Sequence, residues 1–96
     1  MGESDKTRVV LRRFCGEVIA LFPDIDEGLG HCMSYMRVGQ HGAASRTLTR
    51  VSRPVDLSEP DAAALVRELT ARGYNLHVIK RMTPSKAPRK LIENQY

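Results

Sequence analysis

The clearest structural signal in the chain is a helical pattern between Ser58 and Gly73. Ser58 and Asp61 have the spacing of a capping box, and Pro60 between them is tolerated because first-turn amides have no partner inside a helix. Small and apolar side chains then recur at helical spacing, and Gly73 is suited to the position that follows a helix. We therefore expect a helix over residues 58–72.

Strand-like patterns lie on both sides of this helix. Residues 31–38 and 45–52 are predicted to be the two strands of a β-hairpin, joined by the glycine-containing loop 39–44. Residues 74–82 alternate between apolar and polar side chains and are predicted to form a third strand. We expect this strand to lie antiparallel beside the first strand of the hairpin.

The N-terminal part of the chain is predicted to be a second helix, over residues 5–22. Val10, Phe14 and Val18 recur four residues apart, which is the spacing of one helix face. Pro23 follows directly and is expected to end the helix.

Together these elements predict an α+β fold, a two-layer α-β-β-α-β domain over residues 1–82. Its three-stranded, mainly antiparallel sheet would pack on the helices. A chain of 96 residues has the length for one hydrophobic core of ordinary size. Residues 83–96 contain prolines and several basic side chains and are predicted to be a basic C-terminal tail.

Positive charge is unevenly distributed along the chain. The formal net charge is +4, and residues 80–96 carry this whole excess, because their five basic residues face only Glu93. Residues 28–55 contain arginines and no acidic residue. Because arginine makes bidentate contacts with phosphate and carboxylate groups, we expect a specific acidic ligand to bind the arginines of this segment.

The predicted hairpin would carry arginines around an aromatic side chain on one face. If Val38 lies opposite Ser45, this face contains Tyr35, while Cys32 and Met36 on the opposite face pack against the helix. Such a face suits a nucleic acid, a protein partner or a second copy of the chain, and the N-terminal helix is a further way to cover it. The predicted binding residues are Tyr35, Arg37, Gln40, His41, Arg46, Arg50, Arg53, His77 and Arg81.

The loop sequence Gly39-Gln40-His41-Gly42 is the segment that folding alone explains least. Two glycines permit a tight turn or the close approach of a ligand, and an amide and an imidazole lie between them. A histidine beside arginines is suited to acid–base chemistry on a phosphodiester, which makes His41 the one candidate catalytic residue. The second acid or base would have to be Tyr35, His31 or His77.

The two cysteines do not form a recognisable metal or disulfide motif. Cys15 lies in an apolar segment and is expected to be a small core residue, and Cys32 follows His31 without a second ligand pair at zinc-site spacing. We therefore expect free thiols, no metal and no other cofactor. No apolar run has the length of a membrane span, and no signal peptide opens the chain, so a cytoplasmic location without membrane contact is predicted.

One part of the chain resembles a group of small bacterial and prophage proteins. The resemblance covers residues 33–82 and rests on Tyr35-Met36-Arg37-Val38-Gly39-Gln40-His41-Gly42-Ala43, on Thr49-Arg50-Val51-Ser52-Arg53-Pro54, and on Arg72-Gly73-Tyr74. No activity is attached to this group, so the resemblance implies only that the Gly-Gln-His-Gly loop matters.

The function predicted from these features is that of a small, non-enzymatic binding or regulatory protein. It would act through a protein partner or through self-association, using the arginine-bearing sheet face. A nucleic-acid-binding module is the alternative, and a small nuclease or phosphotransfer enzyme that depends on His41 is the third hypothesis.

Overall fold

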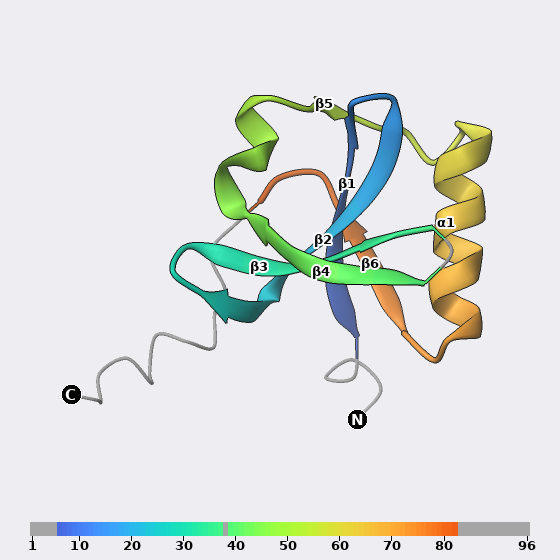
Figure 1. Ribbon diagram of the computed structural model, residues 1–96. Coiled ribbons are helices and arrows are strands. Elements are labelled where there is room, and N and C mark those ends of the chain that lie inside the picture. Colours follow the sequence, from blue (N-terminus) through green and yellow to red (C-terminus); the bar gives the residue numbers. More distant parts are fainter. Residues whose placement is uncertain (1–5, 38, 83–96) are drawn as a thin grey trace.

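The computed structural model describes residues 6–37 and 39–82 as one sheet with a single α-helix packed on it (Figure 1). The predicted tail, residues 83–96, lies outside the described residues. In chain order the elements are β1 (Thr7–Phe14), β2 (Glu17–Gly28), β3 (His31–Met36), β4 (Gln40–Ser45), the 3₁₀ helix η2 (Arg46–Arg50), β5 (Arg53–Pro54), α1 (Pro60–Ala71) and β6 (Leu76–Ile79).

The sheet has six strands, in the order β4-β3-β2-β1-β5, and β6 pairs with the same edge of β1 as a parallel neighbour. All other neighbours are antiparallel. The predicted α+β class is confirmed, but the sheet is larger than the three strands expected. The third predicted strand exists as β6, where it lies beside β1 and not beside the hairpin.

The predicted N-terminal helix is wrong, because residues 7–28 form the β1–β2 hairpin. Cys15 and Gly16 make its turn, and Cys15 has a positive φ of 53°. Consecutive residues such as Val9 and Val10 are both buried, since β1 is covered on both faces. A strand covered on both faces has a nearly continuous run of apolar residues. Such a run also contains apolar residues four positions apart, which is the spacing of a helix face.

The second strand of the predicted hairpin is displaced. β4 covers residues 40–45, although residues 39–44 were expected to be the loop, and Met36 pairs with Gln40 across a short turn. Ser45 therefore lies opposite His31 instead of Val38. Residues 46–50 form η2, whose first turn is capped by the Ser45 hydroxyl, which accepts a hydrogen bond from the Thr47 amide.

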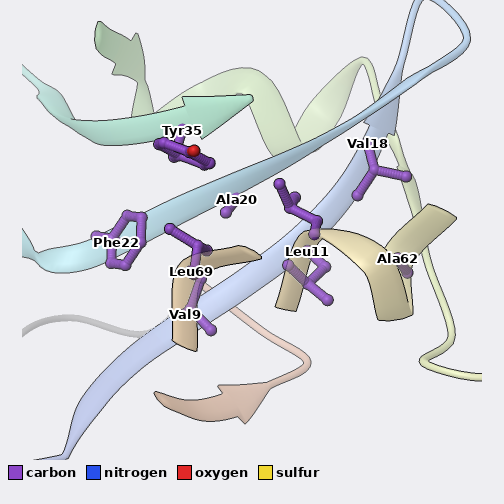
Figure 2. Close-up of a cluster of buried hydrophobic side chains, with 9 residues drawn as sticks. Val9, Leu11, Val18, Ala20, Phe22, Tyr35, Ala62 and Leu69 are labelled. Atoms are coloured by element: carbon purple, nitrogen blue, oxygen red, sulfur yellow. The ribbon is translucent and has the colours of Figure 1, made fainter. Parts of the chain in front are cut away.

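The main hydrophobic core lies between the sheet and α1 (Figure 2). It places the fully buried Leu65 and Leu69 of α1 against strand residues that include the fully buried Tyr35. The hairpin face that packs on the helix is thus the face of Met33 and Tyr35, the reverse of the prediction. Cys32 and Met36, which were expected on this face, lie on the opposite one, because side chains on a strand alternate between the two faces.

A second buried cluster occupies the opposite face of the sheet. Cys32 and Leu21 lie in it, and Leu48 of η2 packs against it. Arg12 holds η2 in this position, because its guanidinium donates to the Thr49 carbonyl at 2.9 Å and to the Ser52 hydroxyl at 2.9 Å. Both faces of the central strands are therefore covered.

The start of α1 is fixed by a charged contact that the sequence pattern did not predict. Glu59 and not Ser58 is the N-cap residue, and it makes no side-chain cap hydrogen bond. Arg13 of β1 donates to Asp61 at 2.9 Å and to Glu59 at 2.8 Å. These hydrogen bonds lower the pKa of both carboxyl groups and raise the pKa of Arg13. Within the described residues, no helix is long and apolar enough to cross a membrane.

Candidate interaction site at the β3–β4 hairpin

Tyr35, the predicted stacking residue, is fully buried in the core under α1. Its hydroxyl donates a hydrogen bond to the Glu68 carboxylate of α1. Burial raises the pKa of the Tyr35 phenol, and the Glu68 hydrogen bond raises it further. A ring in this position is not accessible to a base or to a partner side chain.

The predicted arginines do not gather on one sheet face. Arg46 turns inward and donates to the Pro23 carbonyl at 3.0 Å and to Asp26 at 3.3 Å. Arg50 and Arg53 are exposed on η2 and β5, away from the hairpin turn. The remaining exposed members of the set are Arg37, Gln40, His41, His77 and Arg81.

The hairpin turn and the C-terminal half of α1 form the cluster that does assemble. The Gly39 amide donates to the Tyr35 hydroxyl at 3.0 Å and to the Glu68 carboxylate at 3.3 Å. Gly39 has a positive φ of 76°, and a Cβ at this position would lie 3.0 Å from Arg72 Nη2. A glycine is therefore favoured where the turn meets the helix. Arg37 adds a long ion pair, with its Nε 3.9 Å from Glu68.

His41 lies on the same face of the sheet as this cluster. Its ring meets the Tyr35 ring edge-on, with 4.7 Å between centroids, and its Nε2 is 3.5 Å from the Tyr74 hydroxyl oxygen. The Arg72 guanidinium carbon lies 5.4 Å from the centroid of the Tyr35 ring. His41, Arg72, Gly73 and Tyr74 together line a surface hollow of about 230 Å³.

Three residues of this cluster, Glu68, Arg72 and Tyr74, were not among the predicted site residues. The spacing of Glu68 and Arg72 predicted a surface pair along the helix. Their position over the hairpin turn depends on the strand register, which the sequence pattern left unresolved.

Neither of the other two histidines lies beside His41, where the second acid or base of an enzyme would be needed. His31 pairs with Ser45 at the opposite end of the hairpin. His77 lies on β6 beside Arg8. Its strand neighbours Leu76 and Val78 contact the core under α1, so His77 is on the other face of the sheet from His41. The groups that lie against the imidazole are Tyr35, which is buried, and Tyr74.

The described residues contain no group of three or more His, Cys, Asp or Glu side chains arranged to hold a metal ion. Both cysteines are free thiols. Cys15 is exposed in the β1–β2 turn, which corrects its predicted place in the core, whereas Cys32 is buried. Burial raises the pKa of the Cys32 thiol.

β4 is an edge strand whose outer side pairs with no strand among the described residues. The Arg46 amide donates to the Gly30 carbonyl at 2.9 Å, in the same register as the β3–β4 pairing. Because hydrogen-bonded pairs alternate along an antiparallel ladder, the peptide groups of Gln40, Gly42 and Ala44 point toward β3. Those of His41 and Ala43 consequently point outward, and both residues are exposed.

A larger hollow, of about 360 Å³, lies where β5 and β6 separate along the edge of β1. Leu11 lies at its base, and Val55, Leu57 and Lys80 are among its lining residues. None of the predicted site residues lines it.

The predicted site residues thus fall into two groups. Some lie along the exposed edge of β4, beside the basic hollow that His41 lines, and the predicted arginines on η2 and β5 lie elsewhere. Comparison of the chain with protein-family models, with curated proteins and with solved structures finds no match.

Proposed function

We propose that this protein is a protein-interaction module that binds an extended segment of a partner protein as an additional strand along β4. The observation that carries the proposal is the outer edge of β4, which has six residues in regular pairing with β3 and no strand on its other side within the described chain. An unpaired strand edge presents amide and carbonyl groups that an extended peptide satisfies.

The composition of β4 supports this proposal. Natural edge strands are protected from pairing by charged side chains, proline, bulges or very short length. β4 reads Gln-His-Gly-Ala-Ala-Ser, without a charged residue or a proline. The opposite edge of the sheet is protected, since β5 has two residues, one of them Pro54, and β6 has four.

A partner protein fits the edge better than a second copy of the chain. Two β4 strands that pair about a twofold axis at Ala43 place His41 of each copy opposite Ser45 of the other. Arg46 and the rest of η2 follow Ser45 directly and would meet the turn that carries Arg37 in the other copy. Like charges and a bulky 3₁₀ helix oppose this arrangement, whereas an extended segment brings neither.

The nucleic-acid alternative has less support, because its stacking residue, Tyr35, is buried and Arg46 is engaged inside the protein. The enzyme hypothesis has less support for a comparable reason, since His31 and His77 lie away from His41.

The test removes the outward-pointing amide of Ala43. A random dodecapeptide library is selected against the full chain, and the selected peptides are measured against Ala43→Pro and Ala43→Thr. Proline at this position removes an amide that is not bonded to β3, so the hairpin should stay folded. Threonine retains the amide and is the matched control.

We expect peptides rich in β-branched residues whose binding is lost in Ala43→Pro and kept in Ala43→Thr. Amide chemical shifts should change along β4. Peptides that bind the proline variant equally well would overturn the proposal. A dimer in light scattering that Ala43→Pro converts to a monomer would assign the edge to a second copy instead.

A further inference from the structure

We propose that the hollow lined by His41, Arg72, Gly73 and Tyr74 is a carboxylate-binding site that receives an acidic group of the segment added to β4. The proposal about the segment rests on the proposed function, but the carboxylate site itself is testable without it.

The direction of strand addition brings a chain end to this hollow. A segment that pairs antiparallel to β4 runs from Ser45 toward Gln40, so its C-terminal end arrives beside Gln40 and His41. His41 projects from the same face as Tyr35, its cross-strand partner, and this is the face on which the hollow opens. The hollow therefore lies at the point where an added segment finishes.

The side chains around the hollow are those that recognise a carboxylate. Arg72 supplies a planar guanidinium, which binds carboxylate oxygens through two parallel hydrogen bonds. The Tyr74 hydroxyl and the His41 imidazole add two further polar groups; the Tyr74 hydroxyl oxygen lies 3.5 Å from His41 Nε2, and either group is able to donate to the other or to a carboxylate. Residues of β4 and of the connection between α1 and β6 thus place polar side chains around one small space.

The neighbouring negative groups are occupied by other contacts. Glu68 accepts hydrogen bonds from Tyr35 and from the Gly39 amide, so its carboxylate is held on the hairpin turn. The carbonyls at the C-terminal end of α1 accept from the amides of Arg72, Gly73 and Tyr74. These contacts limit the repulsion that a helix C-terminus would otherwise exert on an anion.

A volume of about 230 Å³ holds a carboxylate with a small side chain and not a drug-sized ligand. The carboxylate has two possible sources with the same chemistry, the C-terminus of the partner chain and an aspartate or glutamate side chain within it. The terminal source matches the direction of the added strand, and the two are separated by the choice of probe.

The experiment uses three single-residue probes and the full chain labelled with ¹⁵N. N-acetyl-alanine carries a terminal carboxylate, N-acetyl-glutamate amide carries only a side-chain carboxylate, and N-acetyl-alanine amide carries none. We expect the signals of the Arg72 Nε–H and the Gly73 amide to move saturably with a carboxylate probe and not with the uncharged amide.

The variant Arg72→Gln should weaken carboxylate binding by about tenfold or more, as expected for loss of a charge-assisted hydrogen bond. Arg72→Lys keeps the positive charge but lacks the planar guanidinium, so its carboxylate affinity should lie between those of the wild type and Arg72→Gln. Arg67→Gln is the matched control, because Arg67 is exposed on the same helix and does not line the hollow. Thermal unfolding of each variant shows that it is folded.

Carboxylate binding that is equal in the wild type and Arg72→Gln, or shifts that do not saturate, would overturn the site. These single-residue probes are too short to pair along β4, so Ala43→Pro should bind them normally. A failed carboxylate site with intact, Ala43-dependent peptide binding would leave the proposed function standing. Carboxylate binding that depends on Arg72, without peptide binding that depends on Ala43, would support the carboxylate site and overturn the proposed strand addition.

Discussion

The hydroxyl of Tyr35 on β3 donates a hydrogen bond to the carboxylate of Glu68 on α1, and the Gly39 amide donates to both groups. This relationship joins the hairpin turn, the sheet and the helix at one point. It also places Arg72 and His41 beside the edge of β4, because both pack around the same tyrosine ring.

Replacing Tyr35 with phenylalanine should destabilise the protein by removing the hydroxyl that links Gly39 and Glu68. The carboxylate of Glu68 loses one of its donors, and we expect the midpoint of thermal unfolding to fall by roughly 5 °C. The control is Tyr74→Phe, because the Tyr74 hydroxyl makes a long contact of 3.5 Å with His41 and its loss should change the midpoint much less. Equal effects of the two substitutions would contradict the importance of the Tyr35 bond.

Gly39→Ala should cost stability for two separable reasons. Its positive φ disfavours alanine by about 1–2 kcal/mol, and the new methyl group would approach Arg72 Nη2. Gly30→Ala is the matched control, since Gly30 has a φ of 79° and open space at the Cβ position. We expect urea denaturation to show a larger loss for Gly39→Ala, with the Arg72 side-chain signal shifted only in that variant.

Leu65→Ala should be among the most destabilising substitutions in the chain. Leu65 is fully buried between α1 and the sheet, and truncation of such a leucine costs about 2–5 kcal/mol. Leu57→Ala is the comparison, because Leu57 is 44% exposed and should cost far less. Chemical denaturation measures both, and similar losses for the two would contradict the assignment of the core.

Acid should weaken the protein in part through the contact of Arg13 with Glu59 and Asp61. The hydrogen bonds from Arg13 hold the pKa of both carboxyl groups below their ordinary values of 4.5 and 3.8. A lowered pKa in the folded state gives stability that is present above these ordinary values and lost as the pH falls through the lowered ones.

The measurement is the free energy of unfolding from pH 7 down to pH 2 for the wild type and for Arg13→Gln. We expect the variant to be less stable at neutral pH and to lose less stability below about pH 4.5. Parallel curves would show that the Arg13 contact does not contribute to the acid sensitivity.

The helix α1 and the strand β6 were predictable because each has a local pattern that only one structure satisfies. Ala62, Leu65 and Leu69 recur at helical spacing, and all three are buried against the sheet. The segment 7–28 lacked such a pattern, since a strand covered on both faces has no polar side to reveal its period.

The amino-acid sequence by itself determined the α+β class, the helix and a β-hairpin whose connection contains Gly39. Only the tertiary structure decided the register of β3 and β4. This register places His41 opposite Tyr35 and Ala43 opposite Met33, on an edge strand with no neighbour on its outer side among the described residues. This register, together with the packing of α1 on the sheet, brings Arg72 and Tyr74, which are distant in sequence, to His41. Cross-strand and helix–sheet packing set these distances, and local sequence pattern does not.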